Sequence, residues 1–95
     1  MIDPTLLILA SLAEGEKHGY AIMTDVQEFA GVRLGAGTLY GAITRLERQG
    51  WIKVINSDER RKPYRLTGEG KRFLEERMAG LESLLKTTRN RLRHA

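Results

Sequence analysis

The sequence predicts a mainly α-helical fold with one small β-hairpin and a long C-terminal helix. Apolar residues recur at helical spacing in four segments, and the stretch after residue 50 is rich in β-branched and aromatic residues. Glycine or proline stands at most of the segment ends. Ninety-five residues suffice for one domain and are too few for a second core, so we expect no separate catalytic domain.

The first predicted helix covers residues 4–13. Asp3 can cap free amide groups, and Pro4 is favourable at the first helical position. Residues 6–10 and Leu12 are apolar around nearly the whole circumference, which requires that more than one face be covered. In so small a domain we expect a second subunit to supply part of that cover.

Two further helices follow in quick succession. One runs from Gly19 to residue 30 and ends at Gly31, and the other spans residues 36–49 between Gly35 and Gly50. Residues 32–34 between them are expected to form a short strand. Two helices with such a tight connection are typical of a helix-turn-helix.

Residues 51–56 and 62–66 favour two strands, and the polar residues 57–61 between them form a basic tip. Pro63 implies either that its strand is an edge strand or that pairing starts after it. A hairpin placed behind a helix-turn-helix is the wing of a winged helix. Residues 1–67 are therefore predicted to be a winged helix-turn-helix unit.

Thr67 is the expected cap of a last helix over residues 68–95, with Gly68 and Gly70 merely tolerated in its first turn. Leucines recur at steps of four and three, as in a heptad seam, along a helix about 35–40 Å long. The far half of such a helix needs a partner, so residues 68–95 are predicted to be a dimerisation helix. The residues expected at the homodimer interface are Leu6, Leu9, Leu74, Met78, Leu81, Leu84, Leu85, Thr88 and Leu92.

The chain carries a formal charge of +4 and has an isoelectric point near 9.8, which favours a polyanionic partner. On a helical wheel, residues 36–49 place Leu39, Ile43 and Leu46 inward. The opposite stripe holds Gly41, Thr44, Arg45 and Arg48 and no acidic residue. Such side chains suit guanine edges, thymine methyl groups and phosphates.

We therefore predict that the chain binds double-stranded DNA through the second helix of the helix-turn-helix and through the wing. The residues expected to contact DNA are Tyr20, Thr38, Tyr40, Gly41, Thr44, Arg45, Arg48, Arg60, Arg61 and Lys62. Two alternatives stay open. The arginines could merely solubilise an amphipathic helix, and Tyr20 and Tyr40 could be half-buried core residues.

Other classes of protein have little support in the sequence. There is no cysteine, only two histidines, and no serine, histidine and acid arranged for nucleophilic catalysis, so we expect no metal, no cofactor and no enzyme activity. The apolar run at residues 6–12 is too short to span a bilayer, so a cytoplasmic protein without membrane contact is expected. Trp51 could be a ligand platform or a core residue.

Three spaced motifs resemble the PadR-like transcriptional regulators. They are residues 18–22 (HGYAI), residues 37–52 with GTLY, RLE and GWI, and residues 64–67 (YRLT). The resemblance covers roughly residues 5–75 and points to the short branch with a single C-terminal helix. It implies a repressor of bacteria or archaea with a winged-helix fold, a dimer formed by the last helix, and release by a small effector.

Departures from the family pattern are Gly35 in place of serine, Gly41 where proline is usual, and Ala21 where an acidic residue is common. They lie near the recognition helix, so they affect the expected operator preference more than the fold.

The leading hypothesis is a homodimeric regulator, a repressor, that places two recognition helices about 34 Å apart on a palindromic operator. A small apolar or aromatic effector would bind a cavity that the dimer supplies. The alternative is a winged-helix module that recruits another protein through its heptad helix and binds no specific DNA.

Overall fold

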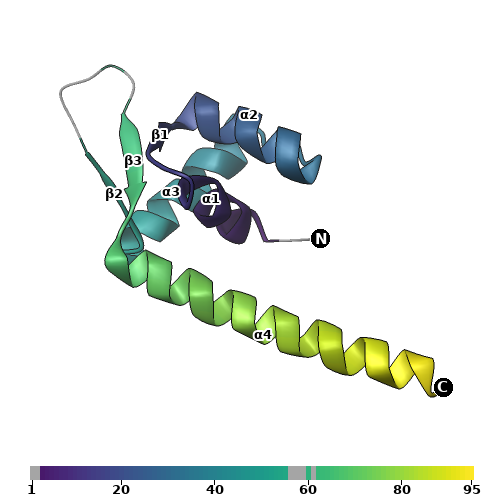
Figure 1. Cartoon of the computed structure of the whole chain (residues 1–95). Coiled ribbons are helices and arrows are strands. Elements are labelled where there is room, and N and C mark those ends of the chain that lie inside the picture. Colours follow the sequence, from purple (N-terminus) through teal and green to yellow (C-terminus); the bar gives the residue numbers. More distant parts are fainter. Residues whose placement is uncertain (1–2, 56–59, 61) are drawn as a thin grey trace.

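The computed structural model describes residues 3–55, 60 and 62–95. Its elements follow the order α1 (Pro4–Leu12), β1 (Lys17–His18), α2 (Gly19–Ala30), α3 (Ala36–Gln49), β2 (Ile52–Val54), β3 (Pro63–Leu66) and α4 (Gly68–Arg93). Helices α1 to α3 pack together beside the small sheet, and α4 projects from them along the long axis (Figure 1). The structure is therefore the predicted winged helix with a long last helix.

The sheet has three antiparallel strands in the order β1-β3-β2. The strand predicted at residues 32–34 is wrong, because this segment is a loop that follows Gly31 and inserts Leu34 into the core. The third strand is instead β1, just before α2, where Lys17 faces Tyr64 and His18 faces Pro63.

Pro63 begins the middle strand of the sheet and pairs with His18, so the edge-strand alternative and the alternative that pairing starts after Pro63 are both wrong. Proline has no amide hydrogen to donate, but it still has a carbonyl group that can accept. The carbonyl of Pro63 accepts a hydrogen bond from the amide of Ile55 at 2.9 Å. The first position of the strand tolerates proline for this reason.

One hydrophobic core joins α1, α2, α3, the sheet and the start of α4. The predicted inward residues of α3, Leu39, Ile43 and Leu46, are buried in it, as is Ala42. The apolar circumference of α1 is covered largely within the same chain, because Leu7, Ile8, Leu9 and Leu12 all belong to this core. A second subunit is not needed to bury them, contrary to the expectation.

A polar network ties α1 to α2 and β1. Ser11, which is 1% exposed, donates a hydrogen bond to the carboxylate of Asp25 at 2.7 Å. The ammonium of Lys17 donates to the carbonyl of Ser11 and lies 3.8 Å from Asp25 and 3.3 Å from Glu14. Each buried polar group thus has a partner, which limits the cost of removing it from water.

The start of α4 is locked onto the end of α3. The hydroxyl of Thr67 accepts a hydrogen bond from the amide of Gly70 at 3.0 Å, as a helix cap does, and donates one to the carbonyl of Gly50 at 2.6 Å. A Cβ atom on Gly70 would overlap the carbonyl oxygen of Trp51, whereas one on Gly68 would meet nothing within 4 Å. Gly70 is therefore required at this close approach and not merely tolerated.

Candidate nucleic-acid interface

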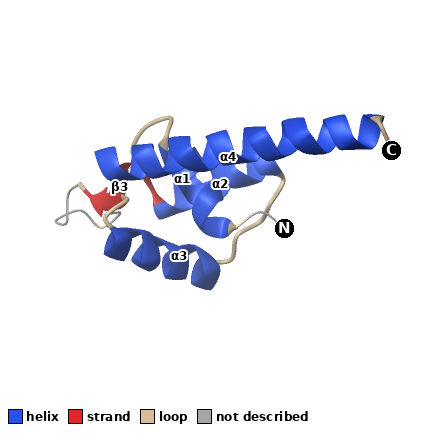
Figure 2. Cartoon of the chain, turned by 90° about the horizontal axis from the view of Figure 1, so that it is seen from below, coloured by secondary structure: helices blue, strands red, loops and turns tan. Residues whose placement is uncertain are grey.

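The outward face of α3 is open to solvent. Thr44, Arg45 and Arg48 are exposed, and Gly41, one turn before Arg45, is half-buried, with the guanidinium of Arg45 lying 3.7 Å from where its Cβ atom would be. The hydroxyl of Thr44 donates to the carbonyl of Tyr40 at 2.9 Å, which holds that side chain along the helix. Helix α3 lies on the opposite side of the molecule from α4, so α4 does not cover this face (Figure 2).

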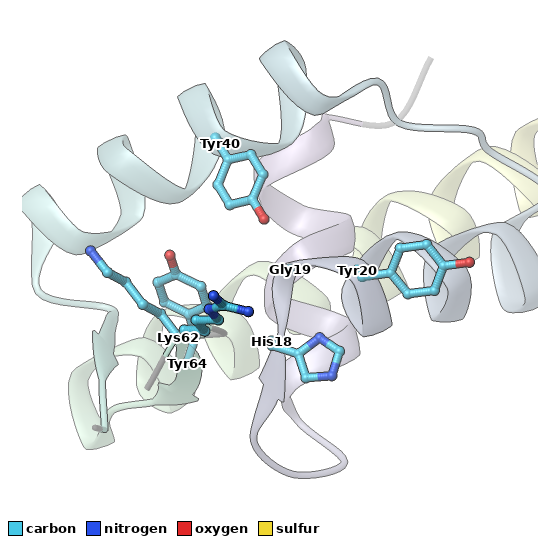
Figure 3. Close-up of a pocket in the computed structure, with 7 residues that line it drawn as sticks. His18, Gly19, Tyr20, Tyr40, Lys62 and Tyr64 are labelled. Atoms are coloured by element: carbon cyan, nitrogen blue, oxygen red, sulfur yellow. The ribbon is translucent and has the colours of Figure 1, made fainter. Parts of the chain in front are cut away.

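A cleft of about 470 Å³ adjoins this face, between the start of α2, helix α3 and the wing. Tyr20, Tyr40, Arg60 and Lys62 line it, and all four belong to the predicted DNA-contacting set. The structure adds His18, Gly19 and Tyr64, which the sequence analysis did not assign to DNA (Figure 3). Only the pairing of β1 with β3 brings these segments together, and a two-residue strand gives no periodic signal.

Tyr20 and Tyr40, which could have been half-buried core residues, are not part of the core. Tyr20 is 71% exposed and its ring points away from Tyr40 and Tyr64 (Figure 3), and Tyr40 is 49% exposed. The ring of Tyr40 lies over Gly19, where a Cβ atom would overlap its hydroxyl group. Gly19 therefore makes the room that lets Tyr40 present its hydroxyl to the cleft (Figure 3).

Tyr64 is buried beneath the cleft at 6% exposure. Burial raises the pKa of its hydroxyl above the usual value, and the charge of Glu47 and the nearby Tyr40 raise it further. Tyr64 consequently stays a neutral hydroxyl at physiological pH.

The structure describes most, but not all, of the residues predicted to contact DNA. Thr38 is exposed at the start of α3, and Arg60 and Lys62 are exposed on the wing. Arg61 lies outside the described residues. None of Arg45, Arg48, Arg60 and Lys62 forms an ion pair with a residue that the structure describes.

Trp51 stacks on Phe73, with ring centroids 3.7 Å apart and an interplanar angle of 14°. Both rings are partly buried and pack against the core. This contact between the residue just before β2 and helix α4 fits the core alternative for Trp51.

The predicted dimer residues fall into two groups. Met78, Leu81, Leu84, Leu85, Thr88 and Leu92 are exposed on α4, and Leu6 is partly buried. Leu9, at 0% exposure, and Leu74, at 6%, are instead buried within their own chain. Their assignment to a dimer interface is wrong in this structure, because core packing of the same protomer already covers both side chains.

No helix among residues 3–55 and 62–95 is long and apolar enough to cross a membrane. Within the same ranges, no cluster of three or more His, Asp or Glu side chains could hold a metal ion.

The fold and its exposed, cationic second helix define a winged helix-turn-helix protein of the class of DNA-binding transcriptional regulators. The chain belongs to the transcriptional regulator PadR-like family, whose family model matches residues 8–76.

Solved structures of transcriptional regulators resemble the chain closely. A PadR family transcription regulator from Clostridium difficile is 33% identical and superposes with a TM-score of 0.82, covering 94% of this chain and 97% of that one. A transcriptional regulator from Clostridium thermocellum is 30% identical, with a TM-score of 0.79 and coverage of 92% and 87%. A PadR family regulator from Eggerthella lenta is 34% identical, with a TM-score of 0.76 and coverage of 93% and 80%.

A curated relative is much longer than this chain. It is an uncharacterized 37.1 kDa protein encoded in a transposon of Streptomyces fradiae, 41% identical over 73 residues. The match covers 77% of this chain, which spans about a fifth of that relative's length.

Proposed function

We propose that the chain is a homodimeric transcriptional repressor that binds a palindromic operator and is released by a small molecule. The observation that carries this proposal is the outward face of α3. It exposes two arginines that form no ion pair with a described residue, and it adjoins a cleft lined by two further cations.

Helix α3 would enter the major groove with this face. Arg45 and Arg48 can donate paired hydrogen bonds to guanine or to phosphate, and Thr44 can contact a thymine methyl group. Gly41 lies one turn before Arg45, whose guanidinium rests over it and would have to move for the helix backbone to come close to the bases. The acidic Glu47 lies beside the stripe, facing the buried Tyr64 closely enough to affect its pKa.

The cleft would hold the sugar-phosphate backbone beside that groove. Lys62 and Arg60 supply positive charge, and the hydroxyl of Tyr40 can donate a hydrogen bond to a phosphate oxygen. Tyr20 and Thr38 stand at the starts of α2 and α3, where free amide groups favour anions. Arg61, at the wing tip, is proposed to reach a neighbouring phosphate or the minor groove.

Residues 68–95 would pair two copies and set the spacing of their recognition helices. The exposed leucines of α4 need cover, and each one buried contributes about 1.5–3 kcal/mol. Two-fold symmetry of the dimer matches a palindromic site with half-sites about 34 Å apart. An apolar or aromatic effector would fit the same leucine-rich surface, between the two subunits.

The test is a mobility shift of promoter-proximal DNA at two salt concentrations with single alanine variants. Arg45→Ala and Arg48→Ala are each expected to lower affinity by about 1–3 kcal/mol and to relax base preference. Arg61→Ala is expected to weaken binding on all sequences and to flatten the salt dependence. Lys71→Ala, at an exposed lysine of α4 that does not line the cleft, is the matched control.

Unchanged affinity in all three variants would contradict the proposed interface. A wild-type protein that forms a dimer but shifts no promoter fragment would favour the module that recruits another protein.

A further inference from the structure

The excess of basic over acidic residues lies outside the part of the chain that holds the proposed operator contact. Residues 1–82 hold twelve Lys and Arg and twelve Asp and Glu, so they are formally neutral. Residues 83–95 hold Lys86, Arg89, Arg91 and Arg93 and no acidic residue. The whole excess of +4 therefore lies at the end of α4.

These cations share a surface with two polar side chains. Lys86, Thr87, Asn90, Arg91 and Arg93 line a shallow hollow of about 540 Å³, which we call the basic end of α4. All five are exposed, and none of the three cations forms an ion pair with a described residue. Glu82, one turn before Lys86, is the last acidic residue of the chain.

The basic end of α4 faces away from the leucine seam. At about 100° per residue, Met78, Leu81, Leu85 and Leu92 cluster on one side of the helix. Asn90, Thr87 and Lys86 lie on the opposite side. Arg93 and Arg91 lie at the two borders of that side, with Arg91 beside Leu84. Pairing of two copies through the seam would therefore leave Lys86, Thr87 and Asn90 open.

The basic end is also remote from the operator contact. The molecule is 57 Å long, and the C-terminal end of α4 lies at the other end of it from the wing (Figure 1). Charges interact over about 8–10 Å at physiological salt, so these cations do not act on phosphates held by α3 of the same chain.

We propose that the basic end of α4 is a second DNA-binding surface, which holds the backbone of a further duplex segment without reading its bases. Lys and Arg neutralise phosphates, and Thr and Asn side chains add hydrogen bonds to phosphate oxygens. A dimer would carry two such ends and could bridge an operator to another stretch of DNA. The bridging rests on the proposed function, whereas the phosphate binding does not.

Duplex DNA fits this surface better than a lipid headgroup does. A helix that binds a membrane inserts its apolar face, and here the apolar face is the exposed leucine seam, which is proposed to pair two copies. A protein already held on DNA also meets further phosphates at high local concentration.

The test measures binding of a labelled random-sequence 20-base-pair duplex by fluorescence anisotropy at several salt concentrations. The variants are built in the full chain that also carries Arg45→Ala, Arg48→Ala and Lys62→Ala, which removes the proposed operator contacts. One variant carries Lys86→Gln and Arg93→Gln together. The control variant carries Lys71→Gln and Arg72→Gln together, which removes the same amount of charge from the other end of the same helix. Sedimentation checks that every variant keeps its oligomeric state.

The double change at the basic end is expected to weaken the remaining binding about tenfold and to lower the slope of log affinity against log salt by about two. The control pair is expected to keep the affinity within about twofold. Equal loss in both pairs would overturn the proposal, since only net charge would then matter. Binding of the same variants to phosphatidylglycerol vesicles and their melting temperatures are measured as well. If the double change at the basic end leaves DNA binding intact and lowers only vesicle binding or only the melting temperature, the proposal is overturned too. If the three alanines alone change nothing, the proposed function fails while this surface stands.

Discussion

The N-terminal unit, from α1 to β3, and helix α4 differ in how far their apolar side chains are exposed. Ile8, Ile22 and Leu39 are fully buried within the chain, whereas Leu84 and Leu92 are 61% and 71% exposed. Both regions repeat apolar residues at helical spacing. The difference shows that the first unit completes its own core, while α4 beyond Leu74 carries apolar surface that this chain does not cover.

The joint between the two regions is rigid. The side chain of Thr67 bonds both the end of α3 and the start of α4, and Gly70 abuts the carbonyl of Trp51. A change in the direction of α4 would therefore be transmitted to the recognition helix through these contacts. In a dimer, this joint would set the distance between the two recognition helices.

The largest expected effect comes from the exposed seam. Replacing Leu81 and Leu85 with Asp puts two charges into the proposed dimer contact, and we expect monomeric or unfolded protein in analytical ultracentrifugation, with a loss of several kcal/mol of association energy. Ala79→Asp with Ser83→Asp has the same spacing on the opposite face and should leave the dimer intact. A full-strength dimer in the leucine variant would show that the seam is wrongly placed.

A smaller effect is expected at the joint. Gly70→Ala forces a methyl group against the Trp51 carbonyl and should lower the free energy of unfolding by about 1–3 kcal/mol. Gly68→Ala, with open space around it, should be neutral or raise stability by about 0.5–1 kcal/mol, since alanine favours helix. Thermal unfolding monitored by circular dichroism measures both, and equal melting temperatures would show that α4 is not tightly seated.

The smallest effect concerns the internal support of the N-terminal unit. Ser11→Ala removes the hydrogen bond to Asp25 while Lys17 still lies near that carboxylate, and we expect a loss of about 1 kcal/mol in urea unfolding. Ser83→Ala, on the exposed part of α4, is the control and should change stability by less than about 0.5 kcal/mol. If Ser83→Ala lowers the free energy of unfolding as much as Ser11→Ala does, burial of the serine does not determine the loss of stability.

Much of this fold could be predicted from local patterns. Asp3 and Pro4 mark the start of α1, the glycines at 31 and 50 end α2 and α3 in the left-handed conformation, and Thr67 caps α4. The inward residues of α3 followed from its helical period alone. These features depend on residues within a turn or two of one another, which a sequence displays directly.

Long-range features escaped prediction. Strand β1 is only two residues long and exists because β3 pairs with it, so no pattern in residues 17–18 announced it. For the same reason His18, Gly19 and Tyr64 were not assigned to the cleft. Leu9 and Leu74 looked like dimer residues because periodicity shows that a face is apolar and does not show which surface covers it.

The sequence by itself determined the helices, their caps, the wing and the outward position of Arg45 and Arg48, because helix period and capping act locally. Only the tertiary structure decided which apolar residues were already covered, that Gly70 must lack a side chain, and that the excess charge sits far from the recognition helix. Those outcomes depend on distances between segments remote in the chain, and packing sets such distances.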